Sequence, residues 1–278
     1  MAQPQSRWVR FKRFLKRNMT PTWAKHFSYQ VFSFLVSVAM VIGVANYAIT
    51  RSYDERKLTF VDGFTITAHT GAFHTNQNSL EAVQAAIDHQ VEAMEIDVRQ
   101  RPNGILVMAH DLVVKNSDGV PLADAFALLE PTAIRLNLDI KETKVLGALH
   151  DLLVEYNLYD RVFLTGLEVW NMNAVKASRD LPYYLNYIPS RFQIFSADYQ
   201  QRLLKILEES GAIGLNCNYK HVGGRLSNFL HKNGYKLSVW TVDRRDTMKR
   251  ILVAKPDNIT TKQYDKLQDV IARWGKNK

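Results

Sequence analysis

Residues that could do acid–base or metal chemistry crowd into one short stretch, AMEIDVRQRPNGILVMAHD (93–111). Glu95 and Asp97 lie two apart in an apolar run, and His110 ends the next apolar run. In a strand, residues two apart point to the same side. Because carboxylates are costly among apolar side chains unless they are neutralised, the pattern predicts a cation beside Glu95 and Asp97.

Further polar residues stand near the ends of other strand-like runs. His69 ends FTITAH and Trp240 comes late in KLSVWTV. Asn137, Asp139 and Lys141 occupy one side of AIRLNLDIK, with apolar side chains on the other. We expect all of them to meet the two carboxylates at one rim, because parallel β/α barrels gather their functional residues at the carboxyl ends of the strands.

Three carboxylates at one site, Glu95, Asp97 and Asp139, would repel one another unless a divalent cation lay between them. Oxygen ligands favour Mg²⁺ or Ca²⁺, and the HxxxH and CxxC spacings typical of zinc sites do not occur in the sequence. His69 and His110 would then be free to move protons at the reacting oxygens.

Lys141 would add a positive charge for a phosphate oxygen. A metal, two histidines and a lysine together suit the cleavage of a phosphodiester, which needs charge neutralisation and acid–base catalysis. Taken alone, each residue has a structural explanation: isolated histidines are usually hydrogen-bonded in place, and Asp139 and Lys141 could form a simple ion pair. Their shared location at predicted strand ends is what favours a function.

Strand-like and helix-like runs alternate from residue 64 onward. NSLEAV begins as an N-capped helix does, and YQQRLLKILEESG has leucines at helical spacing before a glycine stop. ILVMAHD is predicted to pair with the second strand through the turn RPNG. Eight alternating strands predict a (β/α)8 TIM barrel with an extra β-hairpin strand, and a doubly wound sheet is the alternative. The predicted barrel strands are 64–69, 93–98, 133–141, 161–165, 183–188, 212–216, 236–242 and 257–261.

The 278-residue chain has a net charge of +9, and seven of these charges come from residues 1–28, which hold no acid. The remainder is close to neutral, so a nucleic-acid-binding face is not expected. Residues 31–50 carry no charge, a length sufficient to cross a bilayer. Segments rich in lysine and arginine that flank a transmembrane helix stay on the cytoplasmic side. We therefore predict a basic cytoplasmic arm (1–28), a transmembrane helix (29–50), a linker (51–63) and an extracellular barrel domain (64–278). A cleaved signal peptide is the rival interpretation.

The order and spacing of the motifs resemble the glycerophosphodiester phosphodiesterase family, a family of TIM-barrel phosphodiesterases, from about Thr65 to Leu267. The family's opening His-Arg-Gly and Glu-Asn-Thr motifs correspond to AHTGAFHTNQNSLEAV, and its Glu-x-Asp-Val and His-Asp segment to MEIDVRQRPNGILVMAHD. Its acidic-x-Lys strand corresponds to LNLDIK, its Val-Trp-Thr-Val strand to SVWTVD and its closing Asp-Gly-Ile-x-Thr-Asp to PDNITTK. The resemblance implies a metal-dependent enzyme that cleaves glycerophosphodiesters.

Carried over residue by residue, the resemblance implies a site of three parts. These are the catalytic histidines His69 and His110; the ligands of Ca²⁺ or Mg²⁺, Glu95, Asp97 and Asp139; and the substrate contacts Lys141, Trp240, Asn78 and Thr70.

Several positions depart from the family pattern. Thr70 replaces an arginine, which removes a bidentate phosphate donor, and Gln77 replaces a carboxylate near the metal. Asp139 replaces a glutamate, and Lys262 replaces the closing aspartate. His74 could restore part of the missing charge, although a plain loop histidine is the simpler interpretation. Sphingomyelinase D-like phospholipases also lack the arginine that Thr70 replaces and also have an aspartate at the position of Asp139. A lipid or polymeric substrate is therefore an open alternative.

The sequence thus predicts a membrane-anchored phosphodiesterase that hydrolyses glycerophosphodiesters, or related glycerophosphate polymers and lipid headgroups, to glycerol phosphate and an alcohol. One alternative is a sphingomyelinase D-like phospholipase or lyase that forms a cyclic phosphate. Another is a catalytically silent barrel that only binds a ligand. The expected partners are a small or lipid-derived phosphodiester and, through residues 29–50, the cell membrane.

Overall fold

The computed structural model describes residues 8–9, 11–13, 20–177 and 181–276. The chain divides into an N-terminal unit and a larger unit, Tyr53–Lys278. Four basic residues of the predicted arm lie outside the described residues: Arg7, Arg10, Lys16 and Arg17.

Helix α2 (Pro21–Asp54) contains the whole predicted span 29–50 and is longer at both ends. By length and composition this helix can cross a membrane, and a signal sequence near the N-terminus meets the same criteria. The expected division into arm, span, linker and enzyme, with its topology, therefore stays a prediction.

Eight parallel strands close into a ring in the larger unit. Strand β1 pairs with β2 on one side and with β10 on the other, and each remaining strand pairs with the next. This closure confirms the TIM barrel and excludes the doubly wound sheet, whose edge strands would stay open. All eight overlap the predicted strands: β1 (Thr65–Ala68), β2 (Ala93–Gln100), β5 (Arg135–Ile140), β6 (Val162–Leu167), β7 (Tyr183–Asn186), β8 (Gly214–Asn218), β9 (Lys236–Trp240) and β10 (Asn258–Thr261).

The predicted hairpin is present outside the ring. Strand β3 (Leu106–Met108) runs antiparallel to the end of β2, and the turn is closed by Gly104, at φ +90°, whose N–H donates to the Arg101 carbonyl at 2.9 Å. His110 follows β3 by two residues, so the hairpin carries it beyond the end of the barrel strand. A further strand, β4 (Val120–Pro121), was not predicted because two residues make no pattern.

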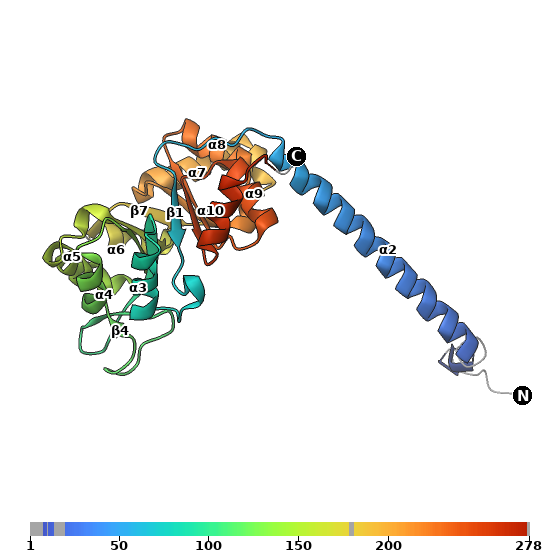
Figure 1. Cartoon of the computed structure of the whole chain (residues 1–278), viewed down its shortest axis with the longest axis horizontal. Helices are drawn as coiled ribbons and strands as arrows, with labels where there is room; N and C mark the ends of the chain where they lie inside the picture. The colour runs from blue at the N-terminus through green and yellow to red at the C-terminus, as the bar shows by residue number, and fades with distance from the viewer. Residues whose placement is uncertain (1–7, 10, 14–19, 178–180, 277–278) are drawn as a thin grey trace, which may run out of the picture. The chain divides into compact units, whose positions relative to one another are not determined.

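Helices cover the outside of the ring (Figure 1). As predicted, α3 begins at an N-cap, where the Ser79 hydroxyl accepts from the Ala82 N–H, and α7 ends at Gly211 in the left-handed conformation. The helices after α2 are α3 (Leu80–Asp88), α4 (Leu122–Leu129), α5 (Leu146–Glu155), α6 (Met172–Ala177), α7 (Ala197–Ser210), α8 (Gly224–Lys232), α9 (Arg245–Ala254) and α10 (Tyr264–Ala272).

Alternation along the strands separates the apolar core from the site. In β5, Leu136, Leu138 and Ile140 are buried in the core. Side chains of a strand alternate in direction, so Asn137 and Asp139 point into the barrel. The same alternation in β2 turns Glu95 and Asp97 inward, since Met94, Ile96 and Val98 belong to the core.

Candidate active site

Three carboxylates converge inside the mouth of the barrel. The strand register puts Asp97 of β2 opposite Asp139 of β5, and Glu95 lies one inward position deeper. Ligand oxygens of Glu95, Asp97 and Asp139 all lie within 4.8 Å of one another. Glu95 and Asp97 are 4% and 2% exposed, so their charges have little help from water. The acidic set predicted from the sequence is therefore brought together.

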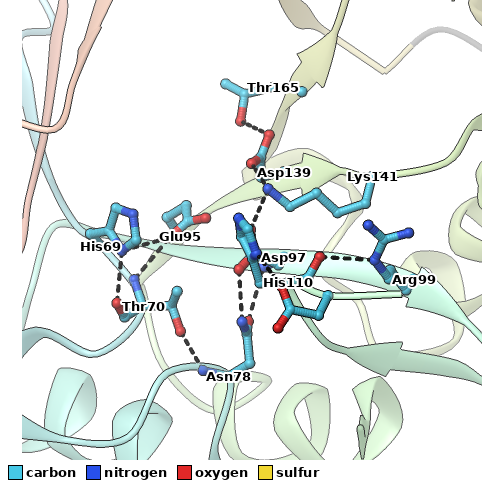
Figure 2. A network of polar contacts seen from close by, with 12 residues as sticks. His69, Thr70, Asn78, Glu95, Asp97, Arg99, His110, Asp139, Lys141 and Thr165 are labelled. Carbon is cyan, nitrogen blue, oxygen red and sulfur yellow. Dashed lines mark hydrogen bonds and ion pairs between the residues drawn. The ribbon is translucent and has the colours of Figure 1, made fainter. Parts of the chain in front are cut away.

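Lys141 is the cation nearest to this cluster. Its Nζ lies 2.8 Å from Asp97 Oδ1 and 2.6 Å from Asp139 Oδ2 (Figure 2). Burial opposes ionisation of both Lys141 and Asp97. The negative charges of Asp139 and Asp97 outweigh it at Lys141 and raise the pKa of that lysine, while the charge of Lys141 lowers the pKa of Asp97. Glu95 is left without such a partner. Burial, followed by repulsion from Asp97 and Asp139, raises the pKa of Glu95 well above its ordinary value.

His69 lies beside Glu95 (Figure 2). Its Nδ1 is 2.7 Å from the Thr70 carbonyl oxygen and 3.4 Å from Glu95 Oε2. A carbonyl oxygen can only accept, so Nδ1 carries the proton and Nε2 keeps a lone pair. Burial lowers the pKa of His69, and the nearby positive charge of Lys262 acts in the same direction. His69 is therefore held as a neutral imidazole with an accepting Nε2.

His110 lies at the outer rim of the same cavity. Its side chain is 63% exposed, and Nδ1 pairs with Asp111 Oδ1 at 2.9 Å. Arg99 Nε donates to the His110 carbonyl oxygen at 2.9 Å, which fastens the end of the hairpin to β2. The two predicted catalytic histidines thus share one cavity but differ in exposure.

Thr70 and Asn78 stand behind the carboxylates, and neither lines the cavity. The Thr70 N–H donates to Glu95 Oε2 at 2.8 Å, while its hydroxyl accepts from the Asn78 N–H at 2.6 Å. Asn78 Nδ2 donates to Asp97 Oδ2 at 2.7 Å, and its Oδ1 accepts from the Asp97 N–H at 3.2 Å. These contacts orient Glu95 and Asp97, and the predicted contact of Thr70 and Asn78 with substrate stays a prediction.

Asp139 is held from the side of β6. Thr165 Oγ1 lies 3.2 Å from Asp139 Oδ1 and 2.8 Å from Asn137 Oδ1, so its one proton serves one of these two acceptors at a time. Gly166 follows at φ +80°, where a Cβ atom would lie 2.4 Å from Asp139 Oδ1. A glycine is needed here, because any side chain would collide with the carboxylate and strain the backbone.

The cavity measures about 230 Å³ and has two chemically different halves. The charged half comes from β1, β2, β5 and the hairpin: His69, Glu95, Asp97, His110, Asp139 and Lys141. The neutral half comes from β5 to β10: Asn137, Thr165, Asn186, Asn216, Trp240, Thr241 and Thr260.

Sequence reasoning found the charged half and, from the neutral half, Asn137 and Trp240. Asn186 and Asn216 were missed, although each stands at an inward position near the end of a predicted strand. The residue type could have revealed them, because asparagine is rare in strands and its presence there suggests a special role. Both now join the candidate site residues.

No known family model matches the chain. It is 25% identical over 239 residues to a protein of Caldanaerobacter subterraneus subsp. tengcongensis named glycerophosphodiester phosphodiesterase, covering 76% of this chain and 98% of that protein. A putative glycerophosphoryl diester phosphodiesterase from Silicibacter pomeroyi has a TM-score of 0.63 at 16% identity, covering 78% of this chain and 96% of that chain. A phosphodiesterase from Oleispira antarctica, solved in complex with the product sn-glycerol-3-phosphate, has a TM-score of 0.60 at 19% identity. The match covers 75% of this chain and 96% of that chain. These likenesses confirm the resemblance to the glycerophosphodiester phosphodiesterase family and the barrel that it implied.

Proposed function

We propose that the chain is a metal-dependent phosphodiesterase that hydrolyses glycerophosphodiesters to glycerol phosphate and an alcohol. The enzyme class is the one named for its sequence relative and its structural neighbours. One observation carries the proposal: three converging carboxylates, a lysine and two histidines line a single cavity.

Glu95, Asp97 and Asp139 would hold the divalent cation. Three carboxylates against the single ammonium of Lys141 leave excess negative charge, and burial together with this repulsion raises the pKa of Glu95. An all-oxygen donor set of this kind fits Mg²⁺ or Ca²⁺. When bound, the cation would polarise a phosphoryl oxygen and neutralise charge that develops at phosphorus.

The two histidines are proposed to move the protons. His69 Nε2, kept unprotonated, suits the base that takes a proton from the attacking water as its oxygen bonds to phosphorus. His110, at the solvent-facing rim, suits the acid that gives a proton to the leaving alcohol oxygen as its bond to phosphorus breaks. Lys141 would steady a phosphate oxygen with its ammonium group.

Helix α2 is proposed to anchor the enzyme in the cell membrane with the N-terminus in the cytoplasm and the barrel outside. The support is its length and apolar composition, with an N-terminal flank that holds basic residues and no acid, whereas the C-terminal flank is mixed in charge. Cysteine labelling of intact cells at positions on either side of the helix tests the topology. Labelling of an N-terminal site but not of a barrel site would contradict it.

The activity is tested with the full chain in detergent, glycerophosphocholine, and Ca²⁺ or Mg²⁺, followed by phosphorus NMR. Glycerol phosphate as the first product, abolished by a chelator and restored by the metal, is the expected result. A cyclic phosphate as the first product would instead support the lyase alternative. A chain that turns over no diester with either metal would support the silent binding domain.

A further inference from the structure

Exposed apolar side chains gather at one end of the barrel. Among the described residues of the larger unit, seven large apolar side chains are more than half exposed: Leu112, Val114, Val154, Trp170, Ile188, Phe192 and Phe195. Six of them belong to segments that follow His110 or the carboxyl ends of β6 and β7, and Val154 alone lies on an outer α-helix. The exposed apolar surface therefore surrounds the end of the barrel where the cavity opens.

The segment after β7 carries the most exposed of these side chains. Ile188, Phe192 and Phe195 are 73%, 89% and 59% exposed. Contact of such side chains with water is unfavourable, and a group of them on the surface of a folded domain marks a place that contacts another molecule.

Unpaired positive charges accompany these apolar side chains. Residues 187–196 and 219–225 contain Arg191, Lys220 and Arg225 and no acid. Within the part of the chain that the structure describes, none of the three forms an ion pair. The guanidinium carbon of Arg225 lies 3.9 Å from the centroid of the Phe195 ring, which joins the two segments. A hollow of about 210 Å³ between them is lined by both arginines.

We propose that this surface docks on an anionic lipid layer. The rim patch consists of Ile188, Arg191, Phe192, Phe195, Lys220 and Arg225. Its basic residues match the phosphates of lipid headgroups, and its apolar side chains match the boundary between headgroups and acyl chains. A nucleic acid fits less well, because it needs a broad positive face and the chain beyond residue 28 is close to neutral.

Docking in this way would bring the mouth of the cavity to the headgroup layer. The two segments of the rim patch follow β7 and β8, whose Asn186 and Asn216 line the cavity. The proposal concerns binding alone, so it can fail without the phosphodiesterase function failing, and the reverse also holds.

The experiment places a polarity-sensitive fluorophore in the rim patch of the full chain. Gln193→Cys provides the exposed attachment site, because the single native cysteine, Cys217, is fully buried. Val154→Cys, on the outer face of α5, is the matched control. The labelled chain is held in nanodiscs of phosphatidylcholine and mixed with vesicles, or held in nanodiscs that themselves contain the anionic lipid, so that docking on either surface is detected.

Equal parts of phosphatidylcholine and phosphatidylglycerol supply the anionic surface. We expect the emission of the Gln193→Cys label to move to shorter wavelength with this mixture in at least one arrangement, and not with phosphatidylcholine alone. Rising salt should weaken the response, because it screens the charges. The Val154→Cys label should not respond.

Two double variants separate the parts of the rim patch. Arg191→Glu with Arg225→Glu should weaken binding to the anionic lipid by about 25-fold or more, at about fivefold for each basic residue lost. Lys232→Glu, at the far end of α8, is the matched control and should leave binding unchanged. Ile188→Ser with Phe192→Ser should weaken binding by about tenfold, and this loss should persist at high salt. All four side chains are exposed, and melting curves check that each variant is folded.

A label that responds to neither anionic arrangement would overturn the proposal and leave another protein as the occupant of the rim patch. An equal response to phosphatidylcholine alone, or an equal response of the Val154→Cys label, would also overturn it. So would charge-reversal variants that bind the anionic lipid as well as the parent does.

Discussion

The charged and neutral halves of the cavity are built by different means. In the charged half, every carboxylate is held by a second polar group: Thr70 for Glu95, Asn78 for Asp97, and Thr165 for Asp139. In the neutral half, Asn186 and Asn216 hold each other across adjacent strands. Buried charge is expensive, so each carboxylate needs a supporting polar group, whereas the two neutral amides share one hydrogen bond within the sheet.

This difference suggests a division of labour, with chemistry in the charged half and recognition of the uncharged part of the substrate in the neutral half. Variants of the charged half should then lower kcat, and variants of the neutral half should change KM or selectivity. The predictions below test that division, beginning with the largest expected effect.

Asp139→Asn should have the largest effect. It keeps the shape of the side chain but removes one of three negative charges proposed to hold the cation. We expect kcat to fall by about 10³-fold or more, because loss of a catalytic cation is worth several kcal/mol. Calorimetry should show weakened Ca²⁺ or Mg²⁺ binding. Asp88→Asn, at the exposed end of α3, is the matched control, and unchanged metal affinity in Asp139→Asn would contradict its assignment as a ligand.

His69→Asn should lower kcat by about 10²- to 10³-fold, the range for loss of a general acid or base. Because His69 is not proposed to bind the cation, metal affinity should change little. His74→Asn is a well-matched control, since exposed His74 has φ +61° and asparagine tolerates that conformation. Equal activity of His69→Asn and the parent enzyme would refute the catalytic role.

Local sequence patterns predicted the charged half because charges are conspicuous in apolar strands. Glu95 and Asp97 stand out in AMEIDV, and the alternation of β5 assigns Asp139 to the inner side. Closure of the ring could not be derived in this way. It depends on β1 meeting β10, a contact between distant segments that periodicity does not encode.

The supporting residues were harder to predict for a different reason. Asn78 reaches Asp97 because its backbone adopts φ +53° in the loop after β1, which the sequence does not reveal. Asn186 and Asn216 carry no charge, so their meeting at one end of the barrel becomes evident only when the strands are in register.

The pKa of Glu95 predicts that metal affinity depends on pH. In the metal-free site the pKa is raised, so Glu95 holds a proton above its ordinary value of 4.5, and the cation must displace that proton. Affinity should therefore rise with pH, by up to about tenfold per unit below the pKa of Glu95 in the folded protein, and level off above it.

Linkage gives the sign of the accompanying change in stability. A carboxyl with a raised pKa in the folded state favours folding at low pH, so the free energy of unfolding of the metal-free protein should fall as pH rises past 4.5. Calorimetry and melting curves across the pH range measure both effects. Glu95→Gln should flatten them, and a parent affinity that does not vary with pH would contradict this account.

Asn78→Gly should weaken metal binding by about tenfold, as expected when a group that orients a ligand is removed. Glycine keeps the left-handed backbone without strain, so the lost contact with Asp97 is the main change. Exposed Asn76→Ala in the same loop is the control. Saturating metal should restore much of the activity of Asn78→Gly, which would not happen if Asn78 acted directly on the reacting atoms.

Trp240→Leu should have the smallest effect and the clearest signature of the neutral half. Removing part of an apolar surface at the mouth weakens contact with the uncharged part of the substrate, so KM should rise by about three- to tenfold while kcat changes little. Trp170→Leu is the matched control, because Trp170 is 80% exposed and lies outside the lining of the cavity. Since both halves line one cavity, a fall in kcat at constant KM would mean that Trp240 shapes the reacting geometry, and the proposed division between them would fail.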